Sequence, residues 1–244
     1  MAEQKRPIVG WLVRTIIVSG YLCFGVYLHG TWERTVIQRF AKLSYNDTNT
    51  WPRNQWLGIP TQQNPNDVWI IQEIITSVKP DYVIETGTFS GGSAVLWAMI
   101  LREANPNGRV ITIDIEDQIK DARKMTIFQQ MVSFLLGSST DPKIVAEVMQ
   151  QVKGKKNLVI LDSDHRKDHV LKEMESYAPL VSLGSYLIVQ DSNINGHPVL
   201  ANFGPGPMEA IEAFLASNGD FESDTDRERL LFTMHPRGYL KRVK

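Results

Sequence analysis

The stretch from Tyr82 to Ser93 reads Tyr-Val-Ile-Glu-Thr-Gly-Thr-Phe-Ser-Gly-Gly-Ser, and it decides the fold. A short run rich in β-branched residues enters a glycine-rich turn, and good helix formers follow from Ala94 to Leu101. This order predicts a strand, a tight turn and a helix. Glycines let the backbone approach a ligand, and a helix N-terminus offers N–H groups to a carboxylate or phosphate. A glycine-rich turn without a ligand is the alternative.

The same pattern repeats on the carboxyl side of this stretch. Val110 to Ile113 forms a second β-branched run, and the helical segment Ser93 to Glu103 separates it from the first. Two further strands are predicted at Leu158 to Leu161 and Tyr186 to Val189, with a helix around His169 to Tyr177 before the second of them. Alternating strands and helices predict an α/β fold, a doubly wound Rossmann-like sheet that is mainly parallel with helices on both faces.

An acidic residue, Asp114, closes the second strand. In folds of this class an acid at this place accepts hydrogen bonds from the ribose hydroxyls of a bound nucleotide. Nicotinamide dinucleotides use the same acid, but the glycines here are spaced Gly87-x-x-x-Gly91 and not as G-x-G-x-x-G. The spacing therefore favours the smaller methionine-bearing cofactor, S-adenosylmethionine, over a dinucleotide.

Polar side chains follow the third and fourth strands directly. The third strand leads into Asp162 to His169, and the fourth into Gln190 to Asn193. The carboxyl ends of parallel strands face one crevice, so these carboxylates can converge on one ion. Oxygen ligands favour Mg²⁺, or Ca²⁺ or Mn²⁺, over zinc. The alternative for these acids is that they only cap helices. For His165 and His169, the alternative to catalysis is a solvated or capping role.

The composition suits one catalytic domain with an N-terminal appendage. The chain has 244 residues and a formal net charge of -1, and this balance argues against a nucleic-acid partner. The single cysteine, Cys23, cannot form an internal disulfide and lies in an apolar run, so neither a disulfide scaffold nor a catalytic thiol is expected. Oligomerisation is left open.

The apolar run from Ile8 to Leu28 has about the length of a membrane helix, roughly 20 residues, with Arg14 as its only charge. No small-residue cleavage pattern follows it. We expect a membrane span or a membrane-surface anchor; a helix packed in the protein or in an oligomer is the alternative. Because the cofactor is expected in the cytosol, the prediction is a membrane-associated protein with its catalytic domain in the cytoplasm.

Three segments are predicted along the chain. Residues 1–43 carry the apolar helix, and residues 44–66 form a linker or lid, since they are polar and lack sustained periodicity. Residues 67–244 form the catalytic domain, beginning with a helix that ends before Pro80. The lid and the loop from Asn193 to Pro207 are expected to shape the pocket for the acceptor.

Several motifs, taken in order, resemble the cephalosporin hydroxylase and rhamnosyl O-methyltransferase family, and more distantly the magnesium-dependent catechol O-methyltransferases. The resemblance covers roughly Trp56 to Tyr239. The motifs are Ile84-Glu85-Thr86-Gly87-Thr88 with Gly91-Gly92-Ser93, Gly137-Ser138-Ser139, Leu161-Asp162-Ser163-Asp164-His165, Gly204-Pro205-Gly206-Pro207-Met208-Glu209-Ala210 and Pro236-Arg237-Gly238-Tyr239-Leu240.

The resemblance implies roles for single residues. Glu85, Gly87 and Ser93 would hold the methionine part of the cofactor. Asp114 would hold the ribose, and Ser138 and Ser139 the adenine edge. The metal would be bound by Asp162 and Asp191, with Gln190 where the family usually has an acid. A neutral ligand there would weaken the hold on Mg²⁺.

A catalytic base is also implied. The catechol enzymes carry an Asp-His-x-Lys-Asp stretch whose lysine removes the acceptor proton, and Asp164 to Asp168 looks similar. The prediction is Lys167 as the base, with His165 as a second catalytic candidate and a surface lysine as the alternative. The expected function is S-adenosylmethionine-dependent O-methylation of a small molecule, sugar or glycolipid. The alternatives are a catalytically silent, membrane-tethered binding subunit, because of Gln190, and a NAD-dependent Rossmann enzyme.

Overall fold

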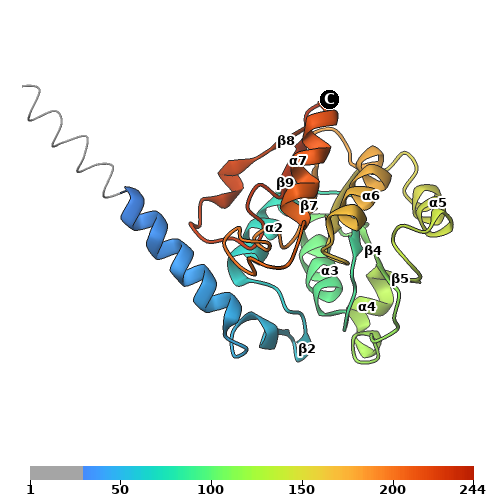
Figure 1. Ribbon diagram of the computed structural model, residues 1–244. Helices are drawn as coiled ribbons and strands as arrows, with labels where there is room; N and C mark the ends of the chain where they lie inside the picture. The colour runs from blue at the N-terminus through green and yellow to red at the C-terminus, as the bar shows by residue number, and fades with distance from the viewer. Residues whose placement is uncertain (1–29) are drawn as a thin grey trace, which may run out of the picture. The chain divides into compact units, whose positions relative to one another are not determined.

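The computed structural model describes residues 30–244. The chain divides into two units between Leu43 and Ser44, and each is described by itself. In the first unit, residues 30–43 are helical. The predicted apolar helix on residues 8–28 lies outside the described residues. The second unit carries the sheet and every element discussed below (Figure 1).

The predicted membrane association is corrected by the described part of the chain. A membrane-spanning helix needs about 20 consecutive apolar residues. Within residues 30–244, no helix combines that length with enough apolar character to cross a bilayer. For this part of the chain, the predicted membrane association is therefore wrong.

A seven-stranded sheet forms the centre of the second unit, in the order β5-β4-β3-β6-β7-β9-β8. The first five strands in this order are parallel, and β9 and β8 add an antiparallel edge. The predicted α/β, mainly parallel sheet is confirmed. The strands are β3 (Tyr82–Thr86), β4 (Arg109–Asp114), β5 (Val132–Leu136), β6 (Asn157–Leu161), β7 (Tyr186–Val189), β8 (Phe221–Ser223) and β9 (Tyr239–Arg242).

Helices cover both faces of this sheet because side chains alternate along each buried strand. Val83 of β3 belongs to the cluster of buried apolar residues under α2, α3 and α4, whereas Ile84 belongs to the cluster under α5, α6 and α7. Figure 1 shows α6 and α7 side by side. The helices are α2 (Pro65–Val78), α3 (Gly92–Ala104), α4 (Thr126–Met131), α5 (Pro142–Gln151), α6 (Lys167–Tyr177) and α7 (Pro207–Ser217), and the short 3-10 helices are Trp51–Arg53, Ala122–Lys124, Ala178–Leu180 and Thr225–Glu228.

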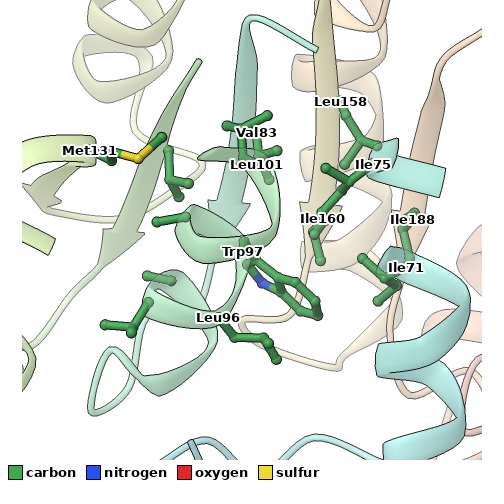
Figure 2. Close-up of a cluster of buried hydrophobic side chains, with 14 of the residues drawn as sticks. Ile71, Ile75, Val83, Leu96, Trp97, Leu101, Met131, Leu158, Ile160 and Ile188 are labelled. Atoms are coloured by element: carbon green, nitrogen blue, oxygen red, sulfur yellow. The ribbon is translucent and has the colours of Figure 1, made fainter. Parts of the chain in front are cut away.

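Trp97 is the largest side chain of the first cluster, and it is fully buried. Figure 2 shows it among side chains from α2, α3 and three neighbouring strands, including Ile71, Ile160 and Ile188. This packing fixes α3 against the sheet, and α3 begins at the glycine-rich turn. The core therefore determines where the first N–H groups of α3 lie.

The chain reverses its direction across the sheet between β3 and β6. From β3 it moves outward to β4 and β5, and then it returns to β6 and moves outward the other way to β7. A crevice forms at such a switch point, at the carboxyl ends of the strands. Gly87 lies there with φ 84°, and a Cβ on it would come within 1.8 Å of the carbonyl oxygen of Asp162. Only glycine allows the two strand ends to approach this closely.

Residues 44–66, predicted as a linker or lid, contain the 3-10 helix Trp51–Arg53 and a small hairpin of β1 (Gln55–Trp56) and β2 (Ile59–Pro60). The hairpin lies against the start of α3, since a Cβ on Gly92 would be 2.4 Å from the carbonyl oxygen of Pro60. The segment that follows the hairpin leads directly into α2. Because the hairpin packs against α3, residues 61–64 lie at the switch point of the sheet.

Candidate active site

A cavity of about 590 Å³ lies at the switch point. All five parallel strands contribute to it through the residues at or just after their carboxyl ends. Its lining includes Gly87, Thr88, Ser93, Asp114, Ser138, Ser139, Asp162, His165, His169, Gln190 and Asp191, together with Thr61 to Asn64, Met234 and His235. The structure thus brings together most of the site residues predicted from the sequence.

Asp114 joins the two loops on one side of the cavity. Its Oδ2 accepts a hydrogen bond from the backbone N–H of Phe89 at 2.8 Å, and its Oδ1 accepts one from the N–H of Glu116 at 3.0 Å. Each carboxylate oxygen has further lone pairs, so the side chain can accept more hydrogen bonds from a ligand. Asp114 lines the cavity where the sequence predicted a ribose ligand.

The N-terminus of α3 opens at the same side of the cavity. Its N-cap, Gly91, has a left-handed backbone with φ 83°, and no side chain caps the helix. The first N–H groups of α3 are then suited to an anion such as a carboxylate. Ser93, in the first turn of the helix, lines the cavity.

Glu85, predicted to hold the methionine part of the cofactor, does not line the cavity. Its side chain is fully buried and accepts hydrogen bonds from Trp97 Nε1 at 2.8 Å and Thr112 Oγ1 at 2.6 Å. Burial raises the pKa of this carboxyl group to about 7, against the lowering effect of its hydrogen bonds. The structure therefore places Glu85 between α3 and β4, beneath the cofactor turn.

Ser138 and Ser139 line the cavity after β5, as the adenine assignment requires. The backbone N–H of Gly137 donates to the carbonyl of Asp114 at 2.8 Å, which ties this loop to the end of β4. The hydroxyl of Tyr177 donates to the carbonyl of Ser139 at 2.8 Å. These bonds hold the two serines on the Asp114 side of the cavity.

Two of the predicted metal ligands, Asp162 and Asp191, lie together on the other side with His165, which was predicted as a catalytic residue. One oxygen of each carboxylate and one imidazole nitrogen all lie within 4.8 Å of one another. The third predicted ligand, Gln190, lines the same cavity. His165 Nε2 is 3.3 Å from Asp191 Oδ2. Burial and the nearby charge of Asp191 raise the pKa of Asp162 well above its ordinary value. A cation would relieve this repulsion, so the donor set fits a divalent ion.

Gln63 is a member of this cluster that the sequence analysis missed. Its Nε2 is 3.0 Å from Asp162 Oδ2 and 3.0 Å from Gln190 Oε1. It comes from the segment between β2 and α2, which carries no spacing motif. The only signal in the sequence was a polar run before a proline that begins a helix.

Asp191 is positioned from outside the cavity. Its backbone is left-handed, with φ 54°, and its N–H donates to Nδ1 of His235 at 3.0 Å. His235 Nε2 lies 3.7 Å from an oxygen of buried Asp67, beyond hydrogen-bond distance. Asp67 accepts hydrogen bonds from four other groups, which are Asn64 Nδ2, the N–H of Met234 and the hydroxyls of Thr233 and Tyr239. Asp67 thereby joins the start of α2 to the loop before β9.

Lys167, the predicted base, does not line the cavity. It is the first residue of α6, and its backbone N–H donates to the carbonyl of Pro205 at 3.0 Å. The preceding Arg166 pairs with Asp164 and lowers the pKa of that carboxyl to about 2. Of the two catalytic candidates, only His165 faces the cavity.

Comparison with known proteins identifies relatives over nearly the whole chain. The family model for rhamnosyl O-methyltransferase/CmcI matches residues 48–243. A rhamnosyl O-methyltransferase of Mycobacterium tuberculosis is 42% identical over 98% of both chains. The enzyme of the same name from Mycobacterium leprae is 38% identical over 85% of this chain and 91% of its own. Mouse catechol O-methyltransferase is 30% identical over 53% of this chain and 49% of its own.

Solved structures share the fold. An apo structure of CmcI superposes with a TM-score of 0.59 and 18% identity, covering 79% of this chain and 77% of its own. A CmcI structure with Mg-SAM gives a TM-score of 0.58 and 18% identity, covering 79% and 78%. At this identity the likeness is one of fold.

Proposed function

Because this chain belongs to the rhamnosyl O-methyltransferase/CmcI family, we propose that it methylates a hydroxyl group of a rhamnosyl residue with the help of a divalent cation. The resemblance drawn from the sequence motifs is confirmed, and the chain is an S-adenosylmethionine-dependent O-methyltransferase. The two alternative functions, a silent binding subunit and a NAD-dependent enzyme, find no support among the relatives. The sugar and the cation are the proposed part.

One observation carries the proposal. The acidic cluster of Asp162, His165 and Asp191 lies in the same cavity as Asp114 and the start of α3. A methyl donor held on one side would have an acceptor hydroxyl beside carboxylates and an imidazole on the other. The 42% identity with named rhamnosyl O-methyltransferases over 98% of both chains supports a sugar as the acceptor.

S-adenosylmethionine, when bound, supplies an electrophilic methyl group, so that an S–C bond breaks as an O–C bond forms on the acceptor. The residues present fit this cofactor. The carboxylate of Asp114 would accept hydrogen bonds from the ribose, and the uncapped N-terminus of α3 would bind the methionine carboxylate. Ser138 and Ser139 would bind the adenine edge.

A divalent cation would be held by Asp162 and Asp191 with the amide oxygen of Gln190 beside them. Two carboxylates balance its charge, and amide oxygens are suitable neutral ligands for Mg²⁺ or Mn²⁺. Such an ion would lower the pKa of an acceptor hydroxyl bound to it.

We assign the acceptance of the hydroxyl proton to His165 in place of Lys167. His165 lines the cavity, and its Nε2 faces a carboxylate oxygen of Asp191 at 3.3 Å. If Nε2–H donates to Asp191, the lone pair of Nδ1 is left to accept a proton. The carboxylate also stabilises the imidazolium that results, as in other histidine and carboxylate pairs.

The experiment compares acceptors and variants of the purified full chain. Rhamnosyl glycosides, glucosyl glycosides and catechol are incubated with S-adenosylmethionine, with and without chelation and added Mg²⁺ or Mn²⁺, and methylated products are quantified by mass spectrometry. Rhamnosyl compounds should be methylated, and chelation should reduce the rate. Methylation of catechol alone would replace the proposed acceptor class.

A matched pair of variants tests the base. His165→Gln should lower kcat by roughly 10²-fold or more while cofactor affinity is retained, because general bases contribute about 10²–10⁴-fold. Lys167→Gln should keep most of the activity, since Lys167 does not line the cavity. The reverse pattern would restore Lys167 as the base.

A further inference from the structure

The side chain of Gln63 lies where two predicted cation ligands meet. It is 5% exposed, and its amide nitrogen is 3.0 Å from an oxygen of Asp162 and 3.0 Å from the side-chain oxygen of Gln190. An amide nitrogen carries two N–H groups, so each can point to one of these acceptors. The amide thus places partial positive charge between two oxygen atoms that would ligate a cation.

Two buried polar atoms of this cluster have no hydrogen-bond partner among the described residues. They are Oε1 of Gln63 and Nε2 of Gln190, and Gln190 is only 2% exposed. An unsatisfied buried polar atom costs roughly 1–3 kcal/mol, and it calls for an explanation. Because the two acceptors face Gln63, its amide must present nitrogen to them in the absence of an ion. The unpaired Oε1 is the consequence.

The backbone around Gln63 is held from both sides. Asn54 Nδ2 donates to the carbonyl of Gln63 at 2.9 Å, and the next residue, Asn64, donates through Nδ2 to Asp67 at 2.6 Å. The side chain is therefore anchored at its base, and a half turn about the last side-chain bond exchanges Nε2 for Oε1. This rotation needs no movement of the main chain.

We propose that Gln63 is a ligand of the divalent cation, and that its amide turns over when the ion binds. Without the ion, Nε2 donates to Asp162 and Gln190. With the ion, Oε1 faces it as a neutral ligand beside the carboxylates of Asp162 and Asp191. This inference rests on the cation of the proposed function.

Charge and ligand number support this assignment. Asp162 and Asp191 supply two negative charges, which balance a divalent ion, and Gln190 is neutral where the resemblance leads one to expect an acid. A second neutral oxygen from Gln63 raises the number of oxygen ligands without adding charge, and Mg²⁺ and Mn²⁺ are bound by several such ligands. Since residues 61–64 also line the cavity, the ion would contact a segment that forms part of the cavity wall.

The test measures Mn²⁺ affinity of the full-length protein by electron paramagnetic resonance of the free ion, with S-adenosylhomocysteine present. Gln63→Leu should weaken Mn²⁺ binding about tenfold or more, the scale found when groups around a metal are removed. Gln63→Glu should tighten it about tenfold, since a carboxylate replaces a neutral ligand of a hard cation. A gain in affinity cannot arise from misfolding.

The control is Gln130→Glu. Gln130 is an exposed glutamine of α4 that does not line the cavity, so this variant adds the same charge away from the proposed ion. Its Mn²⁺ affinity should stay within about threefold of the wild-type value, because an exposed charge is screened by solvent. Equal affinities of Gln63→Glu and Gln130→Glu, or an unchanged affinity of Gln63→Leu, would overturn the proposal.

Methyl transfer to the sugar is measured on the same samples. If the wild-type protein methylates rhamnosyl acceptors but its Mn²⁺ affinity does not depend on Gln63, the inference fails and the proposed acceptor stands. If Mn²⁺ binding depends on Gln63 but no sugar is methylated, the proposed acceptor fails and the role of Gln63 stands. The absence of any Mn²⁺ binding overturns the inference.

Discussion

Glu85 is a buried carboxyl group, and replacing it with glutamine should remove a pH-dependent loss of stability. Burial raises the pKa of Glu85 from 4.5 to about 7. Glutamine has nearly the same shape and keeps an oxygen for Trp97 Nε1. Its nitrogen can donate to the hydroxyl of Thr112, which can in turn donate to Thr88, 2.7 Å away. The Glu85→Gln variant should therefore fold.

The sign and size of the effect follow from proton linkage. Between pH 4.5 and pH 7, the native state keeps the proton of Glu85 while the unfolded chain has lost it, so native stability falls as pH rises. A pKa difference of that size corresponds to roughly 3 kcal/mol in total. The stability of Glu85→Gln relative to wild type should therefore rise by about 3 kcal/mol from pH 4 to pH 8.

The assay is urea unfolding of both proteins, without cofactor, followed by tryptophan fluorescence at several pH values. The difference in the free energy of unfolding between the two proteins is taken at each pH. The contributions of groups that titrate equally in both proteins then cancel. The substitution Glu116→Gln, at an exposed position, serves as the control for the chemical change from carboxyl to amide. A difference that stays constant within about 1 kcal/mol from pH 4 to pH 8 would refute the raised pKa.

Three further predictions concern other parts of the site. Asp114→Asn should weaken S-adenosylmethionine binding about tenfold by calorimetry, because hydrogen bonds to a charged group are worth roughly 1.5–3 kcal/mol; unchanged affinity would contradict the ribose assignment. Gly87→Ala should lower the midpoint of urea unfolding strongly or prevent folding, since its Cβ would lie 1.8 Å from the carbonyl oxygen of Asp162; a wild-type midpoint would exclude this close approach. Asp67→Ala should lower the free energy of unfolding by at least about 3 kcal/mol, because several buried donors lose their acceptor at roughly 1–3 kcal/mol each; a loss below about 1 kcal/mol would show that these donors find other partners.

The central strands were predictable because their signal is local. Each of β3, β4, β6 and β7 is a run of apolar, largely β-branched residues buried on both faces, as the interior of a parallel sheet requires. The edge strands were not predicted. β5 has no buried residue, and β8 and β9 are short and partly polar, so the position of each depends on the strand against which it pairs.

Part of the site was predictable for a related reason. Asp114, Asp162 and Asp191 come directly at or after strands, and the carboxyl ends of parallel strands must share one edge of the sheet. Glu85 was predicted to touch the cofactor, yet it is the fourth residue of β3 and its side chain points into the packing between α3 and β4. Gly87, only two residues further along the chain, lines the cavity. Two residues thus separate a buried position from the crevice.

The sequence by itself determined the parallel α/β sheet, the cofactor turn and the acids at the strand ends, because strand periodicity and strand polarity act over a few residues. Only the tertiary structure decided which side chains meet across the cavity. Gln63 reaches Asp162, 99 residues away along the chain, because the hairpin before it packs against the start of α3. Lys167 is kept out of the cavity lining and His165 is included by the way α6 begins against the loop at Pro205. Such contacts depend on the packing of distant segments, and no local pattern encodes them.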